Sequence, residues 1–361
     1  MFREYTVSQL RGRRMRVTRV ERLTADAVAL DLTDSSGAAL RFAPGQFVTL
    51  VVRVGDVDHR RAYSICSAAR GEPTIRIGVK RVQGGVVSTQ LCEQARVGDV
   101  FEVFGPSGTF TDATGSVRPR HVVLIAGGSG ITPLLAIAHA VLADEPASRV
   151  SLVFANRSAA DIMFAGELAG MLEASGERFT VRHVLESIVG GANARRGDRL
   201  TRDVLAAELD ELGGFLPDTV YYVCGPEPMM DEARIALDAR GVARERVKFE
   251  RFTRAARRTE GAVHVELHPL VIHTVARELR TSVSTDQTLL DAGLAVGAPM
   301  AFSCTMGGCG TCRVRVVSGR VEMDEPNCLL PDERAAGHVL ACVARACSPV
   351  TIDLTTTGGA R

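Results

Sequence analysis

Nine cysteines are spread unevenly over the 361 residues of the chain. Three of them, Cys304, Cys309 and Cys312, give the spacing C-x4-C-x2-C, and Cys342 follows after 29 intervening residues. An odd and clustered set argues against a framework of disulfides. It favours a site where thiolates bind metal in a reducing compartment.

The spacing of these four cysteines is typical of a [2Fe–2S] site, in which three thiolates come from one tight loop and the fourth from a distant segment. Gly307, Gly308 and Gly310 suit such a loop, because a chain that wraps a cluster needs backbone angles that other residues avoid. The predicted metal ligands are Cys304, Cys309, Cys312 and Cys342.

Two other interpretations of the cysteines stay open. A zinc site usually has two C-x2-4-C pairs or histidine partners, whereas this chain has a single C-x2-C and no close histidine. The second interpretation is a set of buried thiols without metal. Cys347 is the competitor of Cys342 for the fourth position, and Cys328 is expected to be a small buried residue.

A glycine-rich turn, Gly127–Gly130, separates a predicted apolar strand (His121–Ala126) from a predicted helix (Thr132–Leu142). Thr132 is expected as the N-cap, with Pro133 at the first helical position. A helix N-terminus offers N–H groups and partial positive charge, so it attracts a pyrophosphate. Glycines let the phosphate approach the backbone.

A second turn, Cys224-Gly225-Pro226, follows the predicted strand Val220–Val223 and opens another helix. The two turns should lie side by side at the carboxyl edge of a parallel sheet, where such folds bind ligands. Read alone, this turn also fits a capped helix start with a buried cysteine.

A third candidate site lies earlier in the chain. Arg61-Ala62-Tyr63-Ser64 follows a strand, and Gly84-Gly85 precedes a short helix that is expected to open at Ser88. An arginine and a helix N-terminus can hold a pyrophosphate together, and a tyrosine can cover an aromatic ring.

Composition restricts the class of protein that carries these motifs. Hydrophobic residues make up 46% and charged residues 24%, which excludes a disordered chain. A net charge of +1 gives no basic field, so we expect no nucleic-acid partner. Residues 122–143 carry no Asp, Glu, Lys or Arg, but the glycine turn interrupts them, so we expect no membrane span. With no signal peptide, a cytoplasmic protein is expected.

The texture of the sequence predicts a multi-domain chain. Short alternating strands predict an antiparallel β-barrel, and alternating strands and helices predict an α/β domain with a parallel sheet. A charged linker and a compact α+β unit follow. The predicted limits are 1–118, 119–252, 253–261 and 262–361. Further expected elements are helices at 160–174, 200–212, 227–240 and 288–296 and strands at 263–267 and 313–317.

Taken together, these motifs make the chain resemble the ferredoxin–NADP reductase superfamily in its oxygenase-reductase form, over nearly the whole length. The family order is a flavin barrel, a nicotinamide domain and a β-grasp ferredoxin domain, which is the order predicted here. Its R-x-Y-S, G-G-x-x-S, G-x-G-x-x-P and C-G-P motifs all match, as does its E-x-F ending at Glu250-Arg251-Phe252.

The resemblance implies that Arg61 and Ser88 hold the pyrophosphate of FAD, and that Tyr63 packs on the isoalloxazine with Ser64 near N5. The G-G-x-x-S match favours FAD over FMN. Cys224 and Glu250 would border the contact between nicotinamide and flavin. Predicted catalytic residues are Ser64, Cys224 and Glu250. Predicted cofactor-binding residues are Arg61, Ala62, Tyr63, Ser64, Gly84, Gly85, Ser88, Gly128, Gly130, Thr132, Pro133, Asn156, Arg157, Cys224, Gly225, Pro226 and Phe252, the last shielding the other face of the flavin ring.

The implied activity is electron transfer from NAD(P)H through FAD and the cluster to the terminal component of a mono- or dioxygenase that acts on a ring, a CoA thioester or a steroid. Arg157 could meet a 2′-phosphate, but Glu186 would repel one, so NADH is expected. The partner would dock at the cluster loop, and the protein would act as a monomer. The alternatives are a desaturase or membrane-hydroxylase partner, and a non-catalytic metal-binding module.

Overall fold

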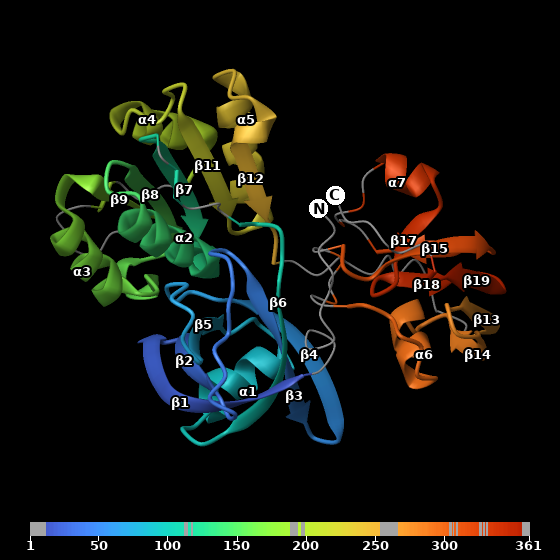
Figure 1. Cartoon of the computed structure of the whole chain (residues 1–361). Coiled ribbons are helices and arrows are strands. Elements are labelled where there is room, and N and C mark those ends of the chain that lie inside the picture. The colour runs from blue at the N-terminus through green and yellow to red at the C-terminus, as the bar shows by residue number, and fades with distance from the viewer. Residues whose placement is uncertain are drawn as a thin grey trace. The chain divides into compact units, whose positions relative to one another are not determined.

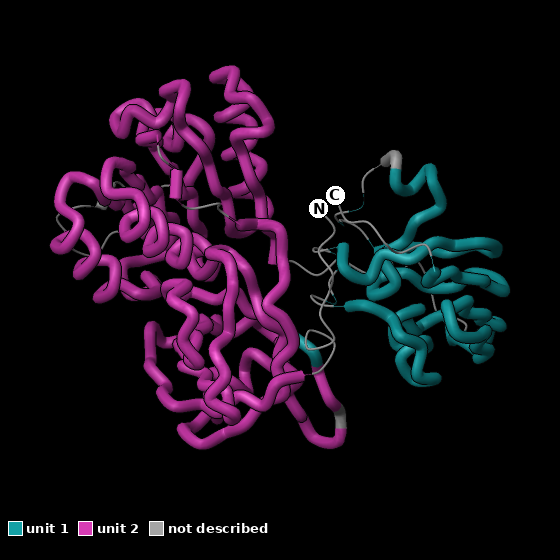
Figure 2. Tube along the Cα trace, viewed as in Figure 1, with its two compact units in different colours: residues 1–11, 60–62, 253–361 teal, residues 12–59, 63–252 magenta. Residues whose placement is uncertain are grey.

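The computed structural model describes residues 12–111, 115–116, 118–187, 194–195, 199–252, 266–302, 305, 307, 310–324, 327, 329 and 331–355. They fall into two compact units (Figure 2). One contains residues 12–59 and 63–252, and the other contains residues 60–62 and the described residues from 266 onward. The predicted linker (253–261) and two predicted cluster ligands, Cys304 and Cys309, lie outside the described residues.

A six-stranded sheet in the order β4-β3-β6-β1-β2-β5 forms the first domain (Figure 1). An antiparallel bridge between Ile65, which directly follows β4, and Ile77 in β5 joins the two edges of this sheet. The sheet therefore closes into a barrel, which leaves no open edge between these strands. Its strands are β1 (Arg13–Thr24), β2 (Ala27–Asp34), β3 (Phe47–Val54), β4 (Val57–Ser64), β5 (Thr74–Lys80) and β6 (Val100–Ser107).

Helix α1 (Val86–Gln94) packs its buried Val87 and Leu91 into the barrel core. The expectation that this helix opens at Ser88 is wrong, because it begins two residues earlier. The Ser88 hydroxyl lies inside the first turn, where it accepts from the N–H of Val82 (3.1 Å) and donates to the carbonyl of Gly85 (3.2 Å). This side chain thus ties the helix start to the preceding glycine turn.

A parallel sheet in the order β10-β9-β8-β7-β11-β12 forms the second domain. Helices α2 and α3 cover one face and α4 and α5 cover the other (Figure 1). The order of the strands reverses direction between β7 and β11, which makes this the switch point where ligands bind in such sheets. The strands are β7 (His121–Gly127), β8 (Arg149–Asn156), β9 (Phe179–Leu185), β10 (Ala194–Arg195), β11 (Thr219–Cys224) and β12 (Val247–Glu250).

Two helix starts in this domain differ from expectation. Helix α2 (Ile131–Asp144) is preceded by a 3-10 turn at Gly128–Gly130, and Thr132 is not its N-cap, because its hydroxyl donates to the Ser129 carbonyl (2.9 Å). The predicted helix at 160–174 is split. A 3-10 turn (Ala159–Asp161) comes first, and α3 (Ala165–Ser175) begins after Phe164, which adopts a left-handed conformation with φ of 60°. Helices α4 (Arg202–Glu211) and α5 (Glu227–Ala239) lie where they were predicted.

A five-stranded sheet in the order β14-β13-β19-β15-β17, with α6 (Leu289–Ala295) packed on it, forms the third domain. The described part of the expected strand at 263–267 is only its last two residues, and the strand observed there runs from Leu267 to His273. The remaining elements are β14 (Glu278–Ser284), β15 (Arg313–Ser318), β17 (His338–Leu340), β19 (Val350–Asp353), the helix α7 (Pro331–Ala335) and the pair β16 (Val321–Met323) and β18 (Ala344–Ala346).

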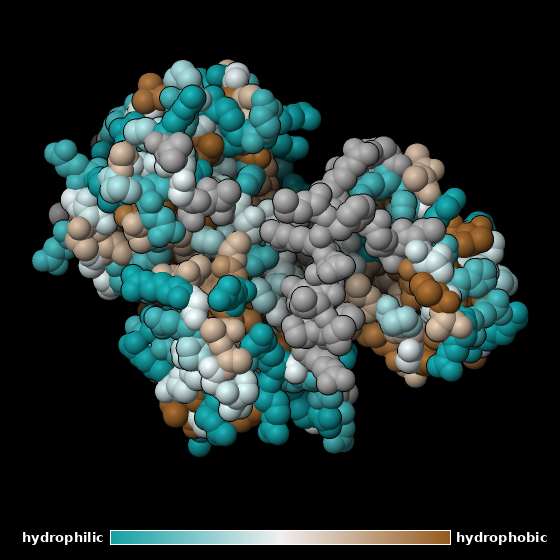
Figure 3. Space-filling model, in the orientation of Figure 1, coloured by the Kyte–Doolittle hydropathy of each residue, from teal (hydrophilic) through white to brown (hydrophobic). Residues whose placement is uncertain are grey.

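None of the helices in the described ranges is long and apolar enough to cross a membrane. On the face seen in Figure 3, hydrophobic residues appear as separate spots among hydrophilic ones. This scatter is normal for a protein surface.

A buried histidine lies at the amino end of the parallel sheet. His121 is 4% exposed, its Nε2 bonds the Ser151 hydroxyl (2.8 Å), and its Nδ1 faces the Arg149 guanidinium (3.2 Å). Burial, together with the charge of Arg149, lowers the pKa of His121 from 6.5 to about 4. The ring is therefore neutral in the folded protein at neutral pH.

We expect the stability of this domain to fall as the pH drops from 6.5 toward 4, because the unfolded chain then binds a proton that the folded chain excludes. The loss should be roughly 2 kcal/mol, after reduction for screening by solvent around Arg149, or about 5 °C in the melting temperature. Calorimetry between pH 4.5 and 7 would measure it. The stability of the His121→Gln variant should depend much less on pH. If its melting temperature falls with pH as steeply as that of the wild type, His121 is not the group responsible.

Candidate cofactor and cluster sites

The glycine turn and the Cys-Gly-Pro turn leave neighbouring strands at the same edge of the sheet. Strands β7 and β11 pair in parallel, with Ala126 opposite Cys224. Helix α2 then covers one face of the sheet and α5 the other. The carboxyl edge of a parallel sheet, where two neighbouring strands lead into helices on opposite faces, is the place where such folds bind ligands.

Glycine is required where these turns meet. A Cβ on Gly130 would lie 2.0 Å from the carbonyl oxygen of Cys224, and a Cβ on Gly225 would lie 2.9 Å from the Gly127 nitrogen. Both obstacles are backbone atoms, which cannot rotate away as a side chain can. The predicted residues Gly130, Cys224 and Gly225 are thus brought together in the structure.

The start of α2 has the features of a phosphate site. Gly128 adopts a φ of +52°, the 3-10 turn leads into a 14-residue helix, and Thr132 and Pro133 lie buried in its first turn. The first N–H groups of such a helix have no partner within it. They can therefore bind an anion.

Lys80, which the sequence analysis did not single out, lies beside this turn. Its Nζ is 3.8 Å from the position of a Cβ on Gly128 and 3.9 Å from Oδ1 of Asp26. It is one of only two lysines in the chain, and its place at the end of β5 puts a cation next to the glycine turn. Its rarity in an arginine-rich sequence was the one available signal.

Asn156 ends β8 at the same edge of the sheet. It is 7% exposed, and neither Oδ1 nor Nδ2 of its amide has a hydrogen-bond partner in the described part of the chain. A buried amide without partners is costly. A ligand with hydroxyl groups, such as a ribose, would satisfy both atoms.

Cys224 and Glu250 lie opposite each other on β11 and β12. Burial raises the pKa of the Cys224 thiol well above its ordinary value, and the nearby Glu250 carboxylate adds to the effect. The thiol therefore stays protonated and is no nucleophile at neutral pH. Phe252 follows β12 and packs, half-buried, against the core on the α2 face.

The two predicted flavin motifs lie on segments that the barrel closure brings together. Arg61, Ala62 and Tyr63 are half-buried at the end of β4, and Ser64 is 4% exposed. The bridge from Ile65 to β5 joins this strand end to the strand that leads into the glycine turn.

That turn is shaped for close approach. Gly84 adopts a φ of +72°, and a Cβ on Gly85 would lie 2.7 Å from the Ser88 hydroxyl. Val82 and Val86 beside it are 63% and 49% exposed. The residues therefore fit a pyrophosphate at the start of α1.

Strand β5 connects the flavin side with the nicotinamide side. A Cβ on Gly78 would lie 2.6 Å from the methyl group of Thr132, so the strand packs directly on the start of α2. Arg76, two residues earlier, pairs with Asp31 of the barrel (2.6 Å) and with Glu167 of α3 (3.5 Å). Strand β5, which leads into the glycine turn before α1, and the start of α2 are therefore neighbours within one compact unit.

In the third domain the structure brings together Cys312 and Cys342, the two predicted cluster ligands that lie within the described residues. The thiol of Cys312 donates to the sulfur of Cys342 at 3.1 Å, and both residues are buried, at 3% and 4% exposure. The Ala341 N–H donates to the Cys312 carbonyl (3.0 Å), which fixes the two segments next to each other. Within the described ranges no third His, Cys, Asp or Glu side chain joins them.

The loop around these thiols fits a cluster. Gly307 and Gly310 have φ of +77° and +71°, and a Cβ on Gly307 would lie 3.3 Å from the methyl groups of Val343. Gly307 thus packs against the segment that carries Cys342. Cys347, the competitor, is exposed, and its sulfur lies 4.0 Å from the Arg345 carbonyl.

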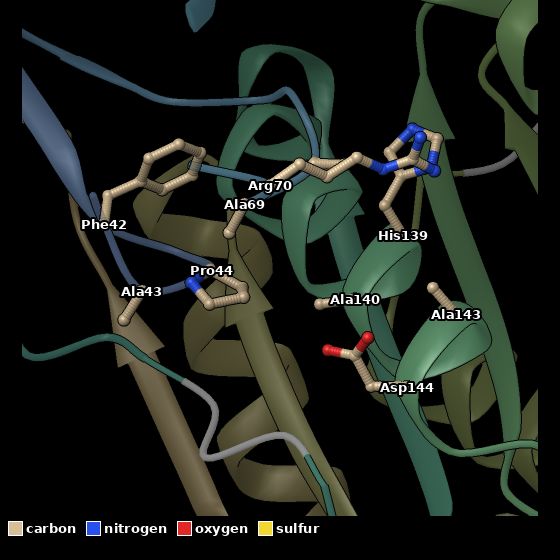
Figure 4. A pocket seen from close by; sticks show the side chains of 10 residues that line it. Phe42, Ala43, Pro44, Ala69, Arg70, His139, Ala140, Ala143 and Asp144 are labelled. Atoms are coloured by element: carbon tan, nitrogen blue, oxygen red, sulfur yellow. The ribbon is translucent and has the colours of Figure 1, made fainter. Parts of the chain in front are cut away.

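A pocket of about 360 Å³ lies along the second half of α2 (Figure 4). Its lining includes His139 and Asp144 of the helix and Phe42 and Pro44 of the barrel domain. The glycine turn lies at the opposite end of α2. This pocket is therefore distinct from the predicted nicotinamide site.

The fold and these sites define a class of protein, an oxidoreductase with flavin, nicotinamide and iron–sulfur domains. Three family models match it in this order: an oxidoreductase FAD-binding domain (residues 14–111), an oxidoreductase NAD-binding domain (124–234) and a 2Fe-2S iron-sulfur cluster binding domain (273–347). The predicted multi-domain fold class and the cofactors FAD, NAD(P)H and [2Fe–2S] are thereby confirmed. The four predicted domain limits stay predictions.

Similar proteins agree with this class. The chain is 34% identical to one of the subunits of 1,2-phenylacetyl-CoA epoxidase from Escherichia coli, over 94% of this chain and 95% of that one. It is 33% identical to the ferredoxin reductase component of 3-ketosteroid-9-alpha-monooxygenase from Rhodococcus rhodochrous, over 94% of each chain. The solved structure of phthalate dioxygenase reductase has the same fold, with a TM-score of 0.67, 23% identity and coverage of 95% and 98%. The chain belongs to the ferredoxin–NADP reductase superfamily, in its branch of oxygenase reductase components.

Proposed function

We propose that this oxidoreductase passes electrons from a nicotinamide dinucleotide to the terminal component of a multicomponent oxygenase. The observation that carries the proposal is the packing of β5 on the start of α2, at Gly78 and Thr132. It makes the flavin side and the nicotinamide side adjacent, as direct hydride transfer requires. Bound FAD would supply the conversion between a two-electron hydride donor and single-electron transfer, and a bound [2Fe–2S] cluster would supply one-electron transfer to the acceptor.

On the flavin side, residues of this chain would bind the FAD and orient its ring. Arg61 and the first turn of α1, which contains Ser88, would hold the pyrophosphate. Gly84 and Gly85 let it approach the backbone. Tyr63 and Phe252 would pack on the flavin ring, and Ser64 would lie near its reactive edge.

On the nicotinamide side, Gly128 and Gly130 with the start of α2 hold the dinucleotide phosphates, and Lys80 adds charge. The amide of Asn156 bonds a ribose. Cys224 and Glu250 border the nicotinamide ring, with Gly225 and Pro226 shaping the turn. The neutral Cys224 thiol packs there and moves no proton.

In the third domain, Cys304, Cys309, Cys312 and Cys342 bind the cluster, and the terminal component docks at the surrounding loop. The two relatives above are named for the epoxidation of a CoA thioester and for the monooxygenation of a steroid. We therefore propose an oxygenase acceptor rather than a desaturase. We also propose that the protein works as a cytoplasmic monomer.

Purified protein should show flavin absorption bands together with a broad visible cluster band, and NADH or NADPH should bleach both. Added to a purified terminal oxygenase encoded beside it, the protein should support turnover in proportion to its concentration. A colourless protein would contradict the proposal. A coloured protein that reduces cytochrome c but supports no oxygenase turnover would contradict the oxygenase as acceptor, and would leave the electron-transfer activity itself in place.

A further inference from the structure

Arg157, the cation nearest the end of β8, is held by carboxylates of its own chain. Dinucleotide-binding sheets recognise the adenosine ribose near this part of the edge, where a free arginine accommodates a 2′-phosphate. Here Nη2 of Arg157 lies 2.5 Å from Oδ1 of Asp161 and 3.2 Å from Oδ2 of Asp26. Asp161 ends a 3-10 turn, and Asp26 lies between β1 and β2 of the barrel.

Asp161 is itself fixed in this position. The Ser158 hydroxyl donates to its Oδ2 at 2.7 Å, while Arg157 occupies Oδ1. Burial alone would raise the pKa of Asp161, but the bonds from Ser158 and Arg157 hold it below the usual value. The carboxylate is therefore ionised at neutral pH, as its pairing with the guanidinium requires.

The loop after β9 fixes the backbone around Arg157. Glu186 follows β9, and its N–H donates to the Asn156 carbonyl (3.1 Å). The N–H of Ser187 donates to the Arg157 carbonyl (2.9 Å). A 2′-phosphate bound here would meet an arginine already paired with two carboxylates, Asp161 and Asp26. The other charges in this region are paired too: the Glu186 carboxylate with Arg199 (3.2 Å) and Lys80 with Asp26 (3.9 Å). The ribose 2′-hydroxyl of NADH needs only a hydrogen-bond partner.

We propose that Asp161 is the residue that sets a preference for NADH over NADPH, by holding Arg157 in an ion pair that a 2′-phosphate would have to break. This inference rests on the proposed function, since it concerns the nucleotide used at the same site. It also explains how an arginine can stand beside the ribose position without selecting NADPH.

Asp161→Asn keeps the shape of the side chain and removes the charge of the shorter of the two ion pairs, which leaves Arg157 only the 3.2 Å contact with Asp26. We expect the ratio of kcat/KM for NADPH to that for NADH to rise by about tenfold, the size typical of one charge-assisted contact. The affinity for 2′,5′-ADP relative to 5′-ADP, measured by calorimetry on the full-length protein, should rise by a similar factor. The double variant with Arg157→Ala should lose both gains.

Asp210→Asn is the matched control. Asp210 pairs with Arg240 at 2.5 Å, but Arg240 follows the end of α5 and so lies at the opposite edge of the sheet. In the Asp210→Asn variant, the ratio of kcat/KM for NADPH to that for NADH should match the ratio in the wild-type protein. Asp161→Ser gives the same comparison should the asparagine variant fail to fold.

A wild-type preference for NADPH, or an unchanged ratio in both Asp161 variants, would overturn the inference. If one of these results is obtained while NADH or NADPH still reduces the flavin, the inference fails but the proposed function stands. If neither nucleotide reduces the flavin of the wild-type protein, the proposed function fails, and the inference fails with it.

Discussion

Cys342→Ala should abolish electron transfer beyond the flavin. Its sulfur lies 3.1 Å from that of Cys312, so its loss removes one of the two buried thiols that the structure places together. The visible absorption and low-temperature EPR signal of the cluster should disappear. Reduction of cytochrome c should fall by at least about 100-fold, since even indirect supports of a metal site cost 10–100-fold. Reduction of ferricyanide, which takes electrons directly from the flavin, should persist.

Cys347→Ala provides the matched control, because it removes an exposed cysteine five residues further on. Its spectrum and both activities should equal those of the wild type. The opposite pattern, with the cluster lost in Cys347→Ala and kept in Cys342→Ala, would transfer the fourth ligand to Cys347. If the wild-type protein shows no cluster absorption and contains zinc instead of iron, the iron–sulfur assignment is wrong.

Gly130→Ala should disturb the proposed nicotinamide site, where the glycine turn meets the Cys-Gly-Pro turn. The added Cβ would stand 2.0 Å from the Cys224 carbonyl oxygen, so the two turns must move apart by an ångström or more. A misplacement of that size in a reacting pair costs about 100-fold in rate. We expect a loss of this order in the rate of flavin reduction by NADH in stopped flow. Overpacking should also destabilise the domain by about 3 kcal/mol.

Gly170→Ala makes the same chemical change on the exposed face of α3, where a Cβ meets nothing within 4 Å. It should leave flavin reduction unaltered and stabilise the helix by about 0.5–1 kcal/mol, since alanine is the better helix former. If the Gly130→Ala variant reduces its flavin at the wild-type rate, the nicotinamide does not bind where the two turns meet.

The sequence was sufficient for features that depend on spacing along the chain. The C-x4-C-x2-C run, the glycine turn after His121–Ala126 and the order of the domains all follow from local patterns, and the structure or the comparisons agree with them. Helix starts were less predictable. Thr132 looked like an N-cap, yet its hydroxyl bonds backward to Ser129, and a 3-10 turn takes the place of a cap.

Contacts between distant segments could not be predicted. Arg157 and Asp26 are 131 residues apart, and nothing local in either segment indicates their ion pair. The same holds for Gly78 against Thr132 and for Lys80 beside Gly128. Each depends on how the barrel packs against the α/β domain, which is a property of the tertiary fold.

The packing of β5 on α2 also determines how this protein can be recombined with its relatives. A chimera joined between the barrel and the α/β domain would pair a foreign strand with the start of α2, and would need a glycine at position 78 and a partner for Glu167 to rebuild that seam. A junction after Phe252 avoids the seam, because it falls where the two compact units divide. Exchange of the electron-delivering module is therefore the natural route to new acceptors, while the flavin and nicotinamide parts must be inherited as a pair.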